Sequence, residues 1–197
     1  MARRRKGVAR RQAIVDAAVE LIVENEQPLS HRAAARRAGV PDSAPSYYFE
    51  SIEELTVEAF RAAIRAFIER IDALTAAVQE TAMTPEEAIH AYVAGAAGQT
   101  RETRMQFVAY LYATSHPAVR REVESAIAAM TKAAEGTIRA IGRPDLCWAA
   151  PIVVAFVDGF TFQRLVLPGG YEGLEDGLLA LLRGLESRPE RADWSSA

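Results

Sequence analysis

The sequence predicts an all-α protein. Apolar residues recur at intervals of three and four along most of the 197 residues, which is the period of helices with one buried face. No segment shows a sustained alternation of apolar and polar residues, which is the pattern of a half-buried strand. Half of the residues are hydrophobic and a quarter are charged, a composition typical of globular proteins.

The first two helices are predicted from an apolar stripe and from two end signals. The stripe of the first helix consists of Ile14, Ala17, Ala18, Leu21 and Ile22. Residues 25–28 are expected to end this helix. A short second helix is expected over residues 31–37, with Ser30 as its N-cap and Gly39 as the residue that ends it.

A third short helix and a long fourth helix follow. Pro41 or Asp42 is expected to cap the third helix, and Pro45 falls in or beside its first turn, where a missing N–H costs least. The segment Ser51–Glu54 has the pattern of a capping box and predicts a helix over residues 51–79. The apolar positions of that helix are Phe60, Ala63, Ile64, Phe67, Ile71, Leu74 and Val78.

Three further helices are predicted up to residue 142. Thr84-Pro85-Glu86-Glu87 combines a cap, a proline at the first position and a glutamate at the third, so a helix is expected to begin there. A helix over about residues 101–114 is so apolar between Met105 and Ala113 that we expect it deep in the core. His116-Pro117 ends it, and the next helix ends at Gly142-Arg143-Pro144.

The last two predicted helices both have strong apolar patterns. Residues 145–167 predict a helix that is covered all round, and Pro151 should kink this helix or delay its start. Pro168-Gly169-Gly170 is expected to form a turn, and residues 188–197 a frayed tail. The stripe of the last helix consists of Leu174, Leu178, Leu181, Leu182 and Leu185.

Charge is distributed unevenly along the chain. The formal net charge is −3, but residues 1–40 contain nine Lys and Arg against four Asp and Glu, a net of +5. The remaining residues therefore carry a net charge of −8. Such an asymmetry suggests that the N-terminal part meets a polyanion, although a merely solvated basic face would have the same composition.

Two short helices joined by Ala38-Gly39-Val40 form the pattern of a helix-turn-helix, in which the second helix enters the major groove of DNA. The four consecutive cations at 3–6 are expected to form a flexible arm along the DNA backbone, with Arg10 and Arg11 nearby. The predicted DNA contacts are Arg3, Arg4, Arg5, Lys6, Ser30, Arg32, Asp42, Ser43, Ala44, Ser46, Tyr47 and Tyr48.

Five short pieces occur in order between Arg11 and Leu55: Ile14-Val15-Asp16-Ala17-Ala18, Ser30-His31-Arg32, Arg37-Ala38-Gly39-Val40, Tyr47-Tyr48-Phe49 and Glu53-Glu54-Leu55. Their order and spacing resemble the DNA-binding domain of the tetracycline-repressor (TetR) family of bacterial transcription regulators. That family often has lysine where this chain has Ile52, so phosphate contacts are expected to shift towards the basic residues near the N-terminus.

The resemblance also implies an effector pocket between residues 56 and 170 and a dimer formed by the last two helices. Aromatic and polarisable side chains suit a mostly apolar pocket, and the effector is expected to be apolar or aromatic. Residues at helical spacing can equally be core residues. The candidates for effector binding are Phe67, Tyr92, Met105, Tyr112, His116 and Phe156, and those for the dimer interface are Leu174, Leu178, Leu181, Leu182 and Leu185.

Other chemistry is not indicated. The three histidines are too scattered for a local metal motif, and we find no Gly-rich phosphate loop and no defensible Ser/His/Asp arrangement, so we predict no catalytic site, metal or cofactor. The longest nearly unbroken apolar run, 147–157, is far shorter than the roughly 20 residues that span a bilayer. The basic N-terminus does not lead into an apolar signal segment. A cytoplasmic protein without membrane association is expected.

These expectations combine into one organisation and one function. A helix-turn-helix domain with a basic arm is predicted over residues 1–52, a helical effector-binding and dimerisation domain over 53–187, and a flexible tail over 188–197. The predicted function is a repressor that binds a pseudo-palindromic double-stranded operator as a homodimer and is released by a small ligand. The alternatives are a constitutive DNA-binding protein and a helical protein–protein adaptor.

Overall fold

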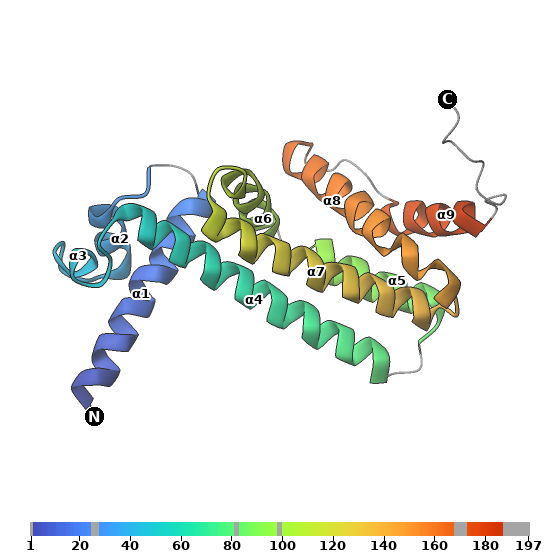
Figure 1. The fold of residues 1–197 in the computed structure, drawn as a ribbon, viewed down its shortest axis with the longest axis horizontal. Coiled ribbons are helices and arrows are strands. Elements are labelled where there is room, and N and C mark those ends of the chain that lie inside the picture. The colour runs from blue at the N-terminus through green and yellow to red at the C-terminus, as the bar shows by residue number, and fades with distance from the viewer. Residues whose placement is uncertain (1, 25–27, 81–82, 98–99, 168–172, 187–197) are drawn as a thin grey trace. The chain divides into compact units, whose positions relative to one another are not determined.

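The computed structural model describes residues 2–24, 28–80, 83–97, 100–167 and 173–186, and these ranges contain helices and no strand (Figure 1). The predicted all-α class is therefore confirmed. The predicted turn at residues 168–170 and the predicted tail at 188–197 lie outside the described residues. The helices are α1 (Ala2–Glu24), α2 (His31–Ala38), α3 (Ala44–Tyr48), α4 (Ile52–Glu80), α5 (Pro85–Ala97), α6 (Thr100–Ala113), α7 (Pro117–Ala140), the 3₁₀-helix η1 (Pro144–Ala149), α8 (Ala150–Val166) and α9 (Leu174–Glu186).

Helix α2 has both of its predicted end signals. The Ser30 hydroxyl oxygen accepts a hydrogen bond from the Ala33 N–H at 3.2 Å, which satisfies one of the unpaired donors at the helix N-terminus. Gly39 has φ 64° and ψ 32°, a left-handed conformation that glycine adopts without a Cβ clash. Its N–H donates to carbonyls of the last turn, so the helix stops here and the chain turns towards α3.

Helix α3 begins later than predicted. The Ala44 N–H donates to the Pro41 carbonyl at 2.8 Å and closes a turn, so the helix starts at Ala44 and not near residue 41. Neither Pro41 nor Asp42 caps the helix. Ser43 occupies the N-cap position without a side-chain hydrogen bond, and Pro45 lies in the first turn as predicted.

The capping boxes at the starts of α4 and α5 are formed differently. At α5 both predicted bonds exist: the Glu87 N–H donates to the Thr84 hydroxyl at 3.2 Å, and the Thr84 N–H donates to the Glu87 carboxylate at 2.8 Å. At α4 the Glu54 N–H donates to the Ser51 hydroxyl at 3.0 Å, but the Glu54 carboxylate accepts from the Glu50 N–H at 2.6 Å.

The predicted flexible arm is wrong in its conformation. Helix α1 begins at Ala2, so residues 3–6 belong to its first turns. The reason is composition: alanine, arginine, lysine and glutamine favour helix, Gly7 opposes it by only about 1 kcal/mol, and the first proline is Pro28. Any contact that these cations make with DNA is therefore made from a helix.

The chain packs into two compact units, and α4 and α7 each continue from one unit into the other. Unit 1 contains residues 1–69 and 99–126, and unit 2 contains residues 70–98 and 127–197. The predicted boundary at residues 52 and 53 does not coincide with this division. The reason is that α6 and the first part of α7 pack with α1 and α4, around a cluster of buried residues: Val23, Phe60, Ile64, Met105, Ala109, Ala113, Val119, Val123 and Ala126.

A second cluster in unit 1 joins α1 to the helix-turn-helix and to the start of α4. It uses the stripe predicted for the first helix, which faces the small side chains of α2 and the large side chains of Phe49 and Leu55. Its buried members are Ile14, Val15, Ala18, Leu21, Ala33, Ala34, Phe49, Leu55 and Ala59. This cluster fixes α2 and α3 on α1.

Helix α6 is not deep in the core, contrary to the prediction. Met105, Ala109 and Ala113 form one buried face, but Leu111 is 73% exposed on the other side. The apolar run suggested burial all round, whereas the helix has only one face against α1, α4 and α7.

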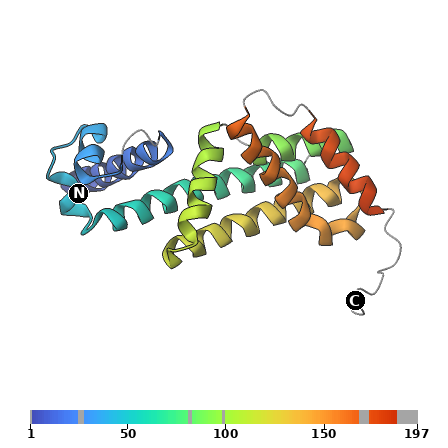
Figure 2. The ribbon, with the colours of Figure 1, turned by 90° about the horizontal axis from the view of Figure 1, so that it is seen from above.

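In unit 2, α5, α8 and α9 pack against one another (Figure 2). Pro151 lies in the first turn of α8, and the residues before it form η1, so the proline delays the helix as predicted. The expectation of a helix covered all round is wrong within one chain, because Ile152, Phe162 and Val166 are exposed. Pro144–Val166 is also the one described stretch long and apolar enough to cross a membrane, a property that core helices of soluble proteins share.

Helix α9 directs its leucine stripe inwards. Leu174, Leu178 and Leu182 are buried within their own chain, which corrects the expectation that they face a partner subunit. A leucine stripe indicates a buried face but does not distinguish the chain's own core from a subunit interface. Leu181 and Leu185 are only partly buried.

Two glycines provide a matched test of the backbone. Gly39→Ala should lower the free energy of unfolding by about 1 kcal/mol, because alanine is strained in the left-handed conformation. Gly184→Ala should raise it by about 0.5–1 kcal/mol, because Gly184 lies in α9 and a Cβ there meets no atom within 4 Å. Urea unfolding of both variants measures the two signs, and equal signs would contradict the assigned backbone conformations.

Candidate DNA interface and effector cavity

Helix α3 and the turn before it present most of the predicted DNA-contacting side chains to solvent. Asp42, Ser43 and Ser46 are exposed, Tyr47 is 84% exposed, and Ala44 and Tyr48 are half-buried. The two tyrosine rings meet edge to face, with centroids 5.1 Å apart. A five-residue helix with a buried Pro45 and an exposed polar face can approach a groove closely.

Helix α2 adds three polar groups to this surface. The Nε atom of Arg32 lies 3.5 Å from the Asp42 carboxylate, and both side chains are exposed. His31 Nδ1 lies 3.2 Å from the Ser46 hydroxyl. The structure thus brings Arg32, Asp42 and Ser46 into one polar surface, with Ser30 exposed at the start of the same helix.

A groove of about 540 Å³ separates the N-terminal part of α1 from α3. It is lined by Lys6, Gly7, Val8, Arg10, Arg11, Tyr47 and Tyr48. Arg5 and Lys6 are exposed, whereas the side chains of Arg3 and Arg4 lie outside the described residues. The groove unites basic residues of α1 with the tyrosines of α3, a combination that suits a phosphate backbone.

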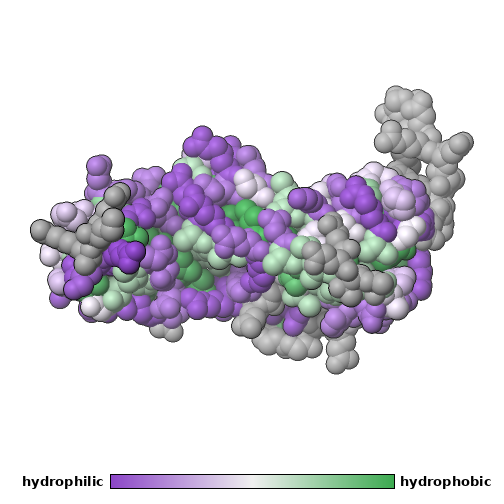
Figure 3. Space-filling view, turned by 90° about the horizontal axis from the view of Figure 1, so that it is seen from below, coloured by the Kyte–Doolittle hydropathy of each residue, from purple (hydrophilic) through white to green (hydrophobic). Residues whose placement is uncertain are grey.

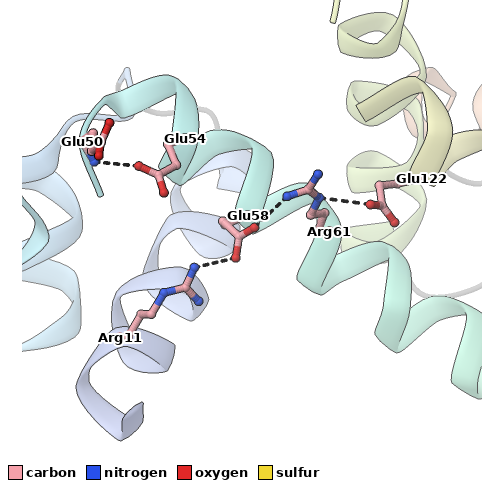
Figure 4. A network of polar contacts seen from close by, with 6 residues as sticks. All are labelled: Arg11, Glu50, Glu54, Glu58, Arg61 and Glu122. Carbon is pink, nitrogen blue, oxygen red and sulfur yellow. Dashed lines mark hydrogen bonds and ion pairs between the residues drawn. The ribbon is translucent and has the colours of Figure 1, made fainter. Parts of the chain in front are cut away.

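Arg11 is the first member of a series of ion pairs, here called the ionic chain, that continues through Glu58 and Arg61 to Glu122 (Figure 4). Its Nη2 lies 2.6 Å from Glu58 Oε2, Glu58 Oε1 lies 3.0 Å from Arg61 Nη1, and Arg61 Nε lies 3.0 Å from Glu122 Oε1. Arg11 above all, and Arg61 with it, hold the pKa of Glu58 below its usual value of 4.5 against the opposing effect of burial. The ionic chain links α1, α4 and α7 within unit 1.

A second ionic cluster holds α2 and α6 on the C-terminal half of α1. Arg37 donates two hydrogen bonds to Glu24, at 2.8 and 2.6 Å, and one to Glu20 at 3.2 Å. The pKa of Glu24 is lowered by its hydrogen bond with Arg37. Arg101 of α6 lies 3.9 Å from Glu20, and Arg104 donates to the Val23 carbonyl at 3.3 Å. Arg37 therefore stabilises the packing of α2 on α1.

Unit 2 contains a small apolar cavity of about 20 Å³, room for a single water-sized molecule. Its lining side chains come from α4, α5 and α7: Ile71, Leu74, Thr75, Val78, Ala91, Tyr92, Gly95, Ala133, Gly136 and Thr137. The hydroxyls of Thr75 and Thr137 donate to carbonyls of their own helices. No charged side chain lines this cavity among the described residues.

Of the six residues predicted to bind an effector, this cavity contains Tyr92 alone. Tyr112 lies between Phe60, at 4.9 Å, and the stacked ring of His116, at 3.6 Å, and burial raises its pKa. Met105 belongs to the cluster that α6 and α7 form with α1 and α4 in unit 1, and Phe67 packs against that cluster. Phe156 contacts Phe160. Sequence reasoning did not select Thr75, Gly95 or Thr137, because small residues on a helix carry no signal of a cavity.

Metal ligands are not gathered in the described part of the chain, where no group of three His, Cys, Asp or Glu side chains could hold an ion. His90 Nδ1 pairs with Glu175 at 2.8 Å and connects α5 to α9.

Hydrophilic residues cover most of the face in Figure 3, and hydrophobic residues appear there as separate small areas.

A family model described as the tetracyclin repressor-like, C-terminal domain matches residues 80–188, more than half of the chain. The chain belongs to the TetR family of transcriptional regulators. The match covers residues 80–188, whereas the sequence motifs lie between Arg11 and Leu55, so the two indications of TetR membership come from separate parts of the chain. No curated protein sequence shows significant similarity to the chain.

Solved structures agree with TetR membership. A transcriptional regulator from Rhodococcus sp. Rha1 has the same fold, with a TM-score of 0.73 at 19% identity over 88% of this chain and 96% of its own. A TetR family member from Streptomyces coelicolor A3 is 27% identical, with a TM-score of 0.64 over 89% and 97% of the two chains. The multidrug binding protein EbrR, complexed with proflavin, is 27% identical, with a TM-score of 0.61 over 87% and 99%.

The lowered pKa of Glu58 predicts a dependence of stability on pH. A carboxylate whose pKa is lower in the folded chain contributes stability above pH 4.5 and loses it as the pH falls below that value. Glu58→Gln should therefore be less stable than the wild type at pH 7, by about 1 kcal/mol, and the difference should shrink below pH 4.5. Thermal unfolding between pH 3 and 7 measures it. Glu124→Gln, at an exposed site on α7, is the control, and a constant difference for Glu58→Gln would contradict the pairing.

Proposed function

We propose that this TetR-family regulator is a repressor that binds a pseudo-palindromic operator as a homodimer and releases it when a small apolar or aromatic effector binds. The observation that carries DNA binding is the polar surface of α2 and α3 next to the basic groove of α1. Exposed tyrosine, serine and arginine side chains supply contacts to base edges, and the groove cations supply contacts to phosphates.

Operator symmetry follows from the dimer. Two recognition helices related by a two-fold axis reach successive major grooves, so the half-sites should be centred about 34–36 Å apart or at a multiple of that distance. Phosphate neutralisation by the cations of α1 should make binding depend on salt, with a slope of about 0.9 for each phosphate contacted.

The exposed face of α8 supports the dimer. Ile152, Ala155, Gly159, Phe162 and Val166 follow one another at intervals of three and four, and all five are exposed in the single chain. This is the spacing of a helix–helix seam. A Cβ at Gly159 would meet no atom of its own chain within 4 Å, so a partner helix can approach closely there. We therefore assign the interface to this stripe and keep the partly buried Leu181 and Leu185 of α9 as further candidates.

The effector proposal rests on the apolar cavity of unit 2 and on relatives that bind ligands. EbrR, at 27% identity, was solved with proflavin, an aromatic compound. The cavity has an apolar lining, as effector pockets commonly do. Its volume of about 20 Å³ is far below the roughly 300–1,000 Å³ of ligand pockets, which is the observation that favours the constitutive alternative.

Selection of bound sequences from random duplex DNA tests the proposed function. At near-physiological salt the wild type should enrich a palindrome and bind it about 10³-fold or more tightly than random sequence. Tyr47→Ala should lose this enrichment, because Tyr47 is 84% exposed on α3. Tyr47→Phe then separates the contribution of the ring from that of the hydroxyl. The enriched duplex then serves as the probe for compounds that release it.

The alternatives give different results in the same selection. Retention of DNA without an enriched sequence would indicate a constitutive, sequence-tolerant binder. Failure to retain any duplex, even at low salt, would contradict DNA binding and favour the adaptor.

Phe162→Asp combined with Val166→Asp should convert the dimer to a monomer. Two charges on each subunit would be buried without partners in the interface, while the single chain keeps its own core. Sedimentation measures the change. Arg164→Asp, at an exposed site on α8 that faces away from the stripe, should remain dimeric. Leu178→Asp should unfold the chain, because Leu178 is fully buried. A dimer that survives the double substitution would refute the placement.

A further inference from the structure

Arg11 belongs both to the groove and to the ionic chain of unit 1. It lines the groove together with Lys6, Arg10 and the tyrosines of α3. Its Nη2 is bonded to Glu58 at 2.6 Å, and its guanidinium lies 4.9 Å from the centre of the Phe49 ring. About two fifths of its side chain is exposed, so an anion in the groove can reach it.

Glu58 can release Arg11 without losing its last partner. Its Oε2 accepts from Arg11 and its Oε1 from Arg61, on the other side of the carboxylate (Figure 4). If Arg11 turned to another anion, Arg61 would still pair with Glu58. The large penalty of leaving a half-buried carboxylate without a cation is thereby avoided.

Phe49 keeps the released guanidinium at the groove. The ring is 1% exposed and packed between α1 and α4, so its position is fixed. A cation over an aromatic face is attracted to it independently of Glu58. Arg11 can therefore change its anionic partner while its side chain stays in place, which limits the loss of conformational entropy.

The geometry points to Arg11 as a phosphate-binding residue of the groove, for which Glu58 competes with a DNA phosphate. Arg61 and Glu122 set the strength of this competition, because Arg61 divides its hydrogen bonds between Glu58 and Glu122 at 3.0 Å each. Loss of Glu122 leaves Arg61 to Glu58 alone and frees Arg11. The contact between α4 and α7 and the affinity for DNA are then linked, and linkage acts in both directions. This inference rests on the DNA binding proposed above.

Salt-dependent binding to a random-sequence duplex tests it. Glu58→Gln should bind about five-fold more tightly at 0.15 M salt, with a slope steeper by about 0.9, the contribution of one phosphate contact. Glu122→Gln should act in the same direction by a smaller factor. Removing any acid favours DNA binding, so Glu124→Gln, an exposed site on the same helix as Glu122, measures that general effect.

Each variant is then repeated with Arg11→Ala. The inference expects Glu58→Gln and Glu122→Gln to have, in that background, no more effect than Glu124→Gln, because the residue they release is gone. Arg121→Ala, exposed on α7, is the matched loss of a cation outside the groove and should leave the slope unchanged. Thermal melts identify variants that do not fold. If Glu58→Gln does not fold, the effect of Glu122→Gln with and without Arg11→Ala tests the inference by itself.

Two results would overturn the inference while leaving the proposed function intact. One is equal effects of Glu58→Gln and Glu122→Gln with and without Arg11. The other is weaker binding by Glu58→Gln, which would show that Glu58 holds Arg11 in place for DNA and does not compete with it. A wild type that binds no duplex at low salt would overturn both the inference and the proposed function.

Discussion

Burial of the apolar stripe of α1 is the interaction on which the DNA-facing surface depends. Helix α3 has five residues and cannot be stable alone, since isolated helices need about 12–15 residues even to be marginal. Its position is fixed by the buried Pro45 and by Phe49, which pack towards α1 and the start of α4. Ala33, Ala34 and Ala35 of α2 are all buried, and their small side chains let α1 approach closely. The polar residues of both short helices are left facing outwards.

Charge pairing sorts the basic residues of the N-terminal region into two groups. Arg37 is bound by Glu24 and Glu20 and stabilises the packing of α1 with α2. Arg11 is bound by Glu58 of α4 but also lines the groove, so it is available to an anion only in competition with Glu58. Lys6 and Arg10 are exposed along the groove, and Arg32 is exposed beside α3. The formal charge of +5 over residues 1–40 therefore overstates the charge directed at a polyanion. It also hides the dependence of Arg11 on an acid 47 residues away, outside that segment.

Features set by neighbouring residues were predictable from the sequence, and features set by distant packing were not. The Ser30 cap, the left-handed Gly39 and the delay at Pro151 each follow from the backbone chemistry of one residue, and each is present. The prediction for the start of α3 is wrong, because Pro41 and Asp42 belong to a turn that precedes the helix and do not cap it. The leucines of α9 and the apolar run of α6 showed that a face is buried but not which partner buries it. The groove between α1 and α3 joins residues about 40 positions apart, and no local pattern indicates it.

Gly95 and Leu74 lie side by side in the lining of the small apolar cavity of unit 2, the cavity proposed to bind the effector. A Cβ at position 95 would overlap Leu74 Cδ1, so glycine, at a cost of about 1 kcal/mol in a helix, lets α4 place this leucine against α5. Leu74 then fills space that an effector would need. When a cavity must open before a ligand can bind, the apparent affinity falls in proportion to the fraction of molecules in the open state. Such a ligand binds the open state and not the unopened one, and this difference in affinity is what shifts the populations of the two states. Helix α4 contributes residues to both units, and Leu74 lies in its second half. Under the proposed function, a ligand that displaced Leu74 would therefore act on a helix that also belongs to the unit with the helix-turn-helix. In that proposal, a ligand that bound without displacing Leu74 would have no preference between the two states and would not shift their populations.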